Sequence, residues 1–186
     1  MARADGRMTA ETAHDTIQDF RRTVGSFPTG VCVVTAEHEG QRAGMTLNSF
    51  TSVSLDPLLV LVSLAHGART LEAVRGAGRF AISILHRGQS EIAIDFAIRG
   101  GAFPGHHARR TEDGYLVVRH ALAELFCDLH EIVTAGDHDI VLGLVRNFVA
   151  VPGEPLVFHA GRFGGVAADA IAPTSFLDFL DEGIGW

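Results

Sequence analysis

The sequence predicts a mainly β domain with a few helices, either a barrel or a sandwich. The prediction rests on roughly six or more short apolar, β-branched segments, with turn signals between them at about ten-residue spacing. The chain has 186 residues, 47% of them apolar, which is enough for one buried core. We expect a flexible tail over residues 1–11, one domain over 12–166 and a C-terminal tail over 167–186.

Helical spacing is the first regular pattern along the chain. Ile17, Phe20, Val24 and Phe27 recur at intervals of three and four, which predicts an amphipathic helix that begins at Thr12. A proline and a glycine soon afterwards end it.

Alternating or continuous apolar runs define the strands. They are predicted over residues 31–35, 41–48, 49–55, 58–64, 79–85, 122–133, 139–150 and 155–159. The run 58–64 is apolar almost throughout, which predicts a strand buried on both faces. Short helices are expected over 68–74 and 88–99, although 88–99 also alternates as a strand would. Residues 100–115 are rich in glycine and charge and predict a surface loop.

Charge and composition exclude several classes of function. The net charge of -7 repels phosphate backbones, and the densest basic spots are single pairs, Arg21-Arg22 and Arg109-Arg110, so no nucleic-acid partner is expected. The longest apolar stretch, 58–65, is far short of the ~20 residues of a membrane span. Residues 1–11 lack the apolar segment of a secretory signal. Cys32 and Cys127 have apolar neighbours, which favours free thiols in the cytoplasm.

The segment 76–81 (GAGRFA) matches a dinucleotide-binding fingerprint only superficially. That fingerprint needs a strand before it and a helix after it. Here the predicted order is reversed, so we interpret the segment as a helix C-cap followed by a strand.

Ten histidines raise the question of a metal site. His106 and His107 are adjacent, and neighbouring side chains on a loop are expected to point apart. No Cys-x-x-Cys pair supports structural zinc either. We therefore expect no metal.

Three segments carry candidate chemistry. Residues 44–54 hold six hydroxyl or amide side chains in eleven positions, as in a strand lining a polar ligand or in a solvated edge strand. Residues 63–71 run from a strand into a helix start, where backbone N–H groups with Ser63, Arg69 and Thr70 could bind a phosphate. Residues 135–139 (AGDHD) form a turn whose aspartate and histidine could be functional or merely exposed.

These segments stand in one order with others along the chain: FRRxxGxFxTGVxVVT (20–35), GMTxNSFTSVSLDP (44–57), RFAISIL (79–85), AGDHDI (135–140) with Gly143, and PLVF (155–158) with Gly161. Together they resemble the flavin reductase family with the FMN-binding split-barrel fold, which includes the reductase components of two-component flavin-dependent monooxygenases. The resemblance covers about residues 17–165. Leu58 replaces a second proline common in the family, and Phe163 stands where a tyrosine is often found.

The resemblance implies a split β-barrel that binds FAD or FMN and a reduced nicotinamide. It implies that the flavin ring lies along Thr46, Leu47, Asn48 and Ser49, and that its phosphate lies at Ser63, Leu64, Ala65, Arg69 and Thr70. It also implies that His138, next to Asp137, lies near the nicotinamide and that Phe163 can stack on a ring.

The family resemblance further implies a homodimer that passes reduced flavin to a separate monooxygenase. NADH is the favoured donor and NADPH stays open, with Arg109-Arg110 as the only candidate for the arginine cluster that would bind a 2′-phosphate. No general base is required, since the cofactors carry the redox chemistry.

The sequence is also compatible with two other functions. One is a flavin-binding electron-transfer module without a nicotinamide site. The other is a relative of pyridoxamine-phosphate oxidases or of haem-binding proteins on a related barrel. The latter would need a more basic phosphate pocket than the single arginine of segment 63–71 provides.

Overall fold

The computed structural model describes residues 10–98 and 100–166. Three α-helices lie in this part of the chain, α1 (Ala10–Val24), α2 (Arg69–Ala77) and α3 (Ser90–Ala97), together with a short 3₁₀-helix, η1 (Gly105–His107). The helix over 88–99 is therefore confirmed, and the first helix begins at Ala10, two residues earlier than expected. The predicted C-terminal tail lies outside the described residues.

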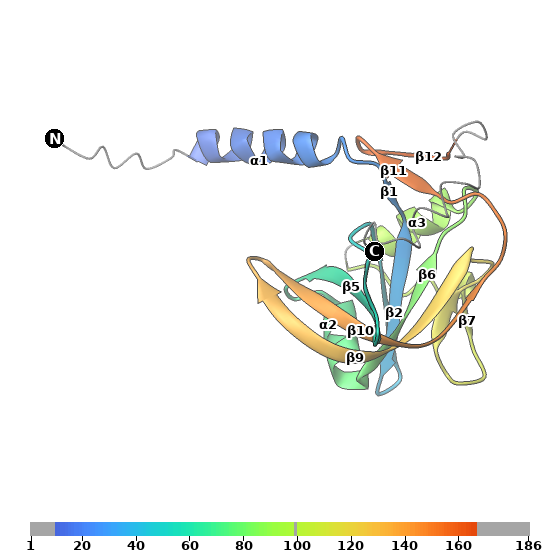
Figure 1. Ribbon diagram of the computed structural model, residues 1–186. Helices are drawn as coiled ribbons and strands as arrows, with labels where there is room; N and C mark the ends of the chain where they lie inside the picture. Colours follow the sequence, from blue (N-terminus) through green and yellow to red (C-terminus); the bar gives the residue numbers. More distant parts are fainter. Residues whose placement is uncertain (1–9, 99, 167–186) are drawn as a thin grey trace.

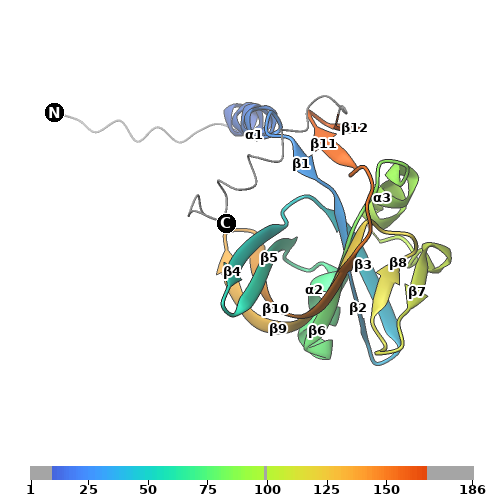
Figure 2. The same cartoon turned by 45° about the vertical axis from the view of Figure 1, so that its right-hand side comes forward.

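A seven-stranded antiparallel sheet forms the body of the protein. Its strand order is β3-β2-β6-β9-β10-β5-β4. The strands are β2 (Cys32–His38), β3 (Gln41–Leu47), β4 (Thr51–Leu55), β5 (Leu58–Ala65), β6 (Arg79–Ile84), β9 (Ala123–Ala135) and β10 (His138–Ala150). The sheet curls strongly around α2, but β3 and β4 remain its two edges (Figures 1 and 2). A curled sheet whose edges do not pair is a barrel open along one line, which agrees with the expected split barrel.

Strand β2 is buried on both faces and divides the core in two. Val31 and Val33 pack with Leu85, Phe96 and neighbouring residues beneath α3. The alternate residues Cys32 and Val34 pack beneath α2 in a larger cluster. Because side chains alternate along a strand, a strand that serves two cores must be apolar at successive positions. This explains the unbroken run at residues 31–34.

The prediction for the run 58–64 is wrong in part. Val60, Val62 and Leu64 are buried in the cluster beneath α2, but the residues between them are only half-buried. On the neighbouring strand β4, Val53 and Leu55 are exposed. One face of β5 therefore packs on the core, and the other belongs to an apolar surface that a single chain leaves uncovered.

Two small sheets were not fully predicted. β7 (Ala108–Arg110) pairs with β8 (Leu116–Val118), so the expected loop 100–115 contains a strand and most of a hairpin. β1 (Thr29–Gly30), β11 (Val157–His159) and β12 (Arg162–Gly164) form a three-stranded sheet beside the main one. The strands β7 and β12 were not predicted because strands this short, with few apolar residues, show little apolar periodicity.

Helix α1 projects away from the curled sheet (Figures 1 and 2). Its apolar positions Ile17, Phe20 and Val24 are 51–66% exposed, and Phe27 just after it is 73% exposed. An amphipathic helix normally buries such a stripe. Within one chain this stripe has no core to pack on. No helix in the described ranges has the length and apolarity needed to cross a bilayer.

Both cysteines are free and buried, as the sequence predicted. Burial raises the pKa of each thiol to about 12, with a further contribution from Asp128 at Cys127. Because the thiolate is the reactive form, Cys32 and Cys127 act as small apolar core residues.

Candidate active site

A cavity of about 340 Å³ opens between α2, α3 and strand β3. Three stretches of chain line it, and each contributes a different chemistry. Residues 42–45 belong to β3, residues 65–70 form the turn into α2, and residues 95–98 and 100–104 form a largely apolar wall. Gly44 and Met45, at the start of the predicted polar segment, therefore line the same cavity as residues 65–70 of the predicted phosphate segment.

The N-terminus of α2 forms the polar end of this cavity. The helix begins at Arg69, and no side chain caps its first turn, so backbone N–H groups there remain available to an anion. Arg69 is exposed and donates to the carbonyl of Gly101, while Thr70 is buried at the same end. Ala65, Arg69 and Thr70 all line the cavity, whereas Leu64 is buried in the core.

The two predicted flavin segments are tied together by a hydroxyl. Oγ of Ser49 accepts a hydrogen bond from the N–H of Ser63 at 2.9 Å and lies 3.2 Å from the carbonyl oxygen of Ser63, to which it donates. Ser49 thereby fixes the end of the polar strand segment against β5. Leu47, by contrast, packs against the core cluster beneath α2.

Two other polar side chains of this segment bond to protein groups. Thr46 donates to the carbonyl of Ala93 in α3 at 2.7 Å, and Asn48 donates to the hydroxyl of Thr29 at 3.1 Å. The residues just before them, Gly44 and Met45, line the cavity. A Cβ on Gly44 would come within 2.7 Å of the Phe96 ring, so glycine allows α3 to pack close and form the wall.

A buried carboxylate joins the elements around the cavity. Asp139 Oδ1 accepts from the Thr134 hydroxyl at 2.8 Å and from Nε2 of His66 at 3.2 Å, and its Oδ2 accepts from Arg75 at 2.6 Å. The hydrogen bond from Thr134 holds the pKa of Asp139 below its usual range, and the bonds from Arg75 and His66 add to this against the opposing effect of burial. The carboxylate is therefore charged at neutral pH.

The turn of the β9–β10 hairpin places His138 beside the cavity. His138 is the register partner of Ala65, which lines the cavity, and its side chain is 42% exposed. Nδ1 of His138 lies 2.7 Å from a carboxylate oxygen of Asp137. The hydrogen bond with His138 lowers the pKa of Asp137. This pairing orients the imidazole and leaves its Nε2 for a ligand.

Of the twelve predicted site residues, three line this cavity, Ala65, Arg69 and Thr70, and the other nine do not. Phe163 is on β12 of the small sheet, its ring centroid 5.5 Å from that of Phe158, and it is not among the lining residues. The stacking role implied for Phe163 therefore has no support in a single chain.

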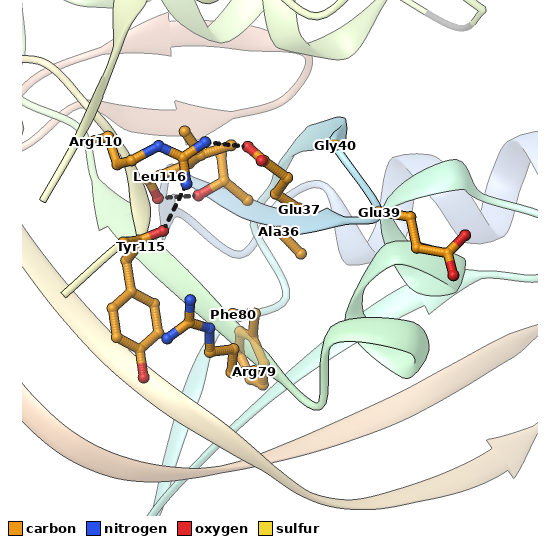
Figure 3. Close-up of a pocket in the computed structure, with 11 residues that line it drawn as sticks. Ala36, Glu37, Glu39, Gly40, Arg79, Phe80, Arg110, Tyr115 and Leu116 are labelled. Atoms are coloured by element: carbon orange, nitrogen blue, oxygen red, sulfur yellow. Dashed lines mark hydrogen bonds and ion pairs between the residues drawn. The ribbon is translucent and has the colours of Figure 1, made fainter.

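The two arginines that are candidates to bind a 2′-phosphate already form ion pairs with carboxylates of this chain. Arg109 makes two hydrogen bonds of 2.7 Å to the buried carboxylate of Glu124. Arg110 pairs with Glu37 at a smaller pocket of about 120 Å³, where Arg79 lies over the Tyr115 ring (Figure 3). Since both guanidinium groups face carboxylates, neither is free to bind a phosphate without losing its partner.

Comparison with known proteins identifies the family. A family model described as a flavin reductase like domain matches residues 24–167. The chain belongs to this flavin reductase family. Among curated relatives, the NADH-dependent FMN reductase SmoA of Agrobacterium fabrum is 40% identical over 79% of this chain and 84% of that protein. HsaB of Mycobacterium tuberculosis, the reductase subunit of a flavin-dependent monooxygenase, is 30% identical over 87% and 89%.

A solved structure in the family has the same fold. The NADH:FAD oxidoreductase SgcE6 of Streptomyces globisporus C-1027, in complex with NAD and FAD fragments, superposes with a TM-score of 0.78 at 38% identity. The match covers 85% of this chain and 96% of that one. The resemblance inferred from the five motifs is thus confirmed.

Some residues around the cavity were missed by sequence reasoning. The sequence predicts residues 100–104 of the wall as part of a surface loop, and it places Asp139 at the start of the strand 139–150 without indicating its partners. The sequence pattern does indicate that Asp139 is buried. It lies two residues before Val141, so both side chains are on the face of β10 that packs on the core. A charged residue at such a position needs partners, which predicts a network.

The Asp139 network gives a pH-dependent contribution to stability. A carboxyl whose pKa is lowered in the folded state stabilises the fold above its unfolded pKa of about 3.9, and this stabilisation is lost as the pH falls through the folded pKa. Asp139→Asn should therefore lower the free energy of unfolding at pH 7, and the difference from wild type should shrink below about pH 4. Denaturant unfolding from pH 3 to pH 8 measures both.

A matched control is Asp128→Asn, which removes an ion pair with Arg146 between side chains that are both over 40% exposed. That variant should change stability much less. A difference between Asp139→Asn and wild type that is unchanged down to pH 3 would contradict the assigned role of the ionised carboxylate.

Proposed function

We propose that this chain is an NADH-dependent flavin reductase that transfers a hydride to FAD or FMN and supplies the reduced flavin to a separate monooxygenase. The observation that carries the proposal is the convergence of the strand at Gly44–Met45 and the uncapped start of α2 on one cavity, in a chain of the flavin reductase family. The proposal is also supported by SmoA and SgcE6, whose names specify NADH with FMN and with FAD.

The residues of the cavity fit a phosphate-bearing flavin. The helix start and Arg69 offer donors and positive charge to the phosphate, and the apolar wall at residues 96–98 and 102–104 offers a surface to the ring. The flavin and the nicotinamide supply the hydride chemistry, so the protein must position them and exclude competing reactions.

Orientation is the contribution expected of His138. Its ring is held by Asp137 through Nδ1, and the backbone carbonyl of Asp137 accepts the N–H of His66 at 3.1 Å. The hairpin turn and the α2 turn are therefore fixed to one another beside the cavity. We infer that Nε2 of His138 binds the nicotinamide or the flavin edge and holds the two reactants in line.

The proposed activity is tested by mixing the protein anaerobically with NADH and an excess of FAD or FMN while following the flavin absorbance band. Bleaching of many flavin equivalents per chain is expected. Repeating the assay with NADPH and with each flavin gives the specificity, and NADH should be the better donor. Flavin binding without bleaching would instead favour the electron-transfer module.

The role of His138 predicts a particular kinetic pattern. His138→Ala should raise the KM for NADH about 3- to 10-fold, the equivalent of one hydrogen bond, and lower kcat less. Steady-state kinetics with varied NADH measures both parameters. His130→Ala, at an exposed position on the neighbouring strand β9, serves as the control and should change neither. A fall in kcat at unchanged KM would contradict a positioning role.

We also propose that the protein is a homodimer. The apolar stripe of α1 and the exposed Val53 and Leu55 on β4 would leave a large hydrophobic area in water if the chain were a monomer. A second copy of the same chain can cover both surfaces through a twofold interface. The free, buried cysteines also favour a reducing cytoplasm as the compartment.

Analytical ultracentrifugation tests the dimer. The wild-type chain should sediment with twice its mass of 19.9 kDa, and Phe20→Glu should shift it toward a single chain because a charge is buried in the interface. Gln18→Glu adds a charge to the same helix outside the apolar stripe and should leave the dimer intact. Wild-type protein that sediments as a single chain would contradict the proposal.

A further inference from the structure

Three side chains able to bind a metal meet at the rim of the cavity, apart from the residues expected to hold flavin. Asp95 lies in the last turn of α3, and His106 and His107 lie in η1. Their ligand atoms are all within 4.8 Å of one another. One oxygen, Oδ2 of Asp95, lies 2.9 Å from Nε2 of His107 and 4.0 Å from Nε2 of His106.

The expectation that the adjacent histidines point apart is wrong. Residues 105–107 form a 3₁₀ turn rather than an extended loop, and the ring centroids of His106 and His107 are 3.9 Å apart. The tight turn brings both rings to the same side, toward α3. The third ligand, which the sequence could not identify, is therefore supplied from eleven positions earlier in the chain, by Asp95.

We propose that Asp95, His106 and His107 form a binding site for a divalent transition metal of the zinc class. Zinc bonds of about 2.0–2.2 Å to nitrogen and oxygen place tetrahedral ligands about 3.3–3.5 Å apart. The two observed separations, 2.9 and 4.0 Å, lie on either side of this value. Rotation of the His106 side chain, which is 71% exposed, shortens its separation from Asp95, and a slight shift between Asp95 and His107 lengthens theirs.

The chemical types of the three ligand atoms determine which metal ions the site prefers. Two imidazole nitrogens and one carboxylate oxygen suit Zn²⁺, Cu²⁺ and Ni²⁺, whereas Mg²⁺ and Ca²⁺ prefer shells made of oxygen. A site with three protein ligands leaves a fourth position for water. The exposure of His106 makes that position accessible from solvent.

Two of the three ligands are already held in place. His107, with 23% of its side chain exposed, bonds to Asp95 in the absence of any metal. The metal replaces the shared proton of this pair. Most of the remaining ordering cost falls on one side chain, His106.

The site would clamp one wall of the cavity. The lining residues of that wall are 95–98 and 100–104, and the proposed ligands are Asp95 at one end and, two and three residues after Pro104, His106 and His107. A metal bridging α3 and η1 therefore closes the intervening chain into a loop and restrains both of its ends. The metal site does not depend on which molecule fills the cavity.

Metal binding is measured on the full chain without an affinity tag, stripped of metal, by isothermal titration with Zn²⁺ and by competition against a chromophoric chelator. One equivalent of Zn²⁺ per chain should bind, and Ca²⁺ and Mg²⁺ should not compete. Cobalt(II) in place of zinc should give a visible absorption spectrum typical of mixed nitrogen and oxygen ligands.

His106→Ala is the decisive variant because it leaves the bond between His107 and Asp95 intact. It should weaken Zn²⁺ binding by more than about tenfold without lowering the melting temperature of the metal-free protein. His130→Ala, at an exposed histidine on β9, is the control and should bind as wild type does. Asp95→Asn should also weaken binding, since it removes the charge of the ligand.

Hydrogen exchange supplies a second readout. Zn²⁺ should slow exchange in residues 96–105 of the wild type and not of His106→Ala. Absence of a one-to-one complex, equal binding by Ca²⁺, or equal weakening in His106→Ala and His130→Ala would each overturn the proposal.

Discussion

The carboxylate of Asp139 is the interaction on which the arrangement of the site depends. It is buried on β10, and it accepts hydrogen bonds from β9 through Thr134, from the turn before α2 through His66 and from α2 itself through Arg75. A buried carboxylate is costly unless its oxygens are satisfied, so these partners cannot move independently. The start of α2 and the hairpin that carries His138 are thereby fixed to each other.

A second constraint comes from β2, which positions the two helices that flank the cavity. Its alternate side chains enter two separate cores, one beneath α2 and one beneath α3. Each helix therefore packs against its own face of the same strand, and the hollow opens between them. Gly44 on the neighbouring strand lets the ring of Phe96 approach closely, which sets the distance between α3 and the strand edge. A single glycine thus determines whether the wall can form.

The sequence predicted the main sheet well because its signals are local. Apolar periodicity located β2, β5, β6, β9 and β10 and the helices, and the ordered motifs identified the family. It failed where the structure depends on partners distant in the chain. The exposed face of β5, the strands β7 and β12 and the convergence of Asp95 with His106 have no local signature, since pairing and shared cavities arise only on folding. The pairing of Arg109 with Glu124 is another case, because it spans two sheets.

The overall charge of the chain opposes the ligands that its site is built to hold. Flavin phosphates and NADH are anions, and the chain carries -7. Screening limits the reach of distant carboxylates to a Debye length of about 8 Å at physiological salt, so the local field decides binding. Around the cavity that field comes from the N-terminus of α2 and from Arg69, which bonds to a backbone carbonyl rather than to a carboxylate. Arg75, by contrast, is neutralised by Asp139. Positive charge thus stays available at the start of α2, whereas the charges of Arg42, Arg75, Arg109 and Arg110 are paired with carboxylates.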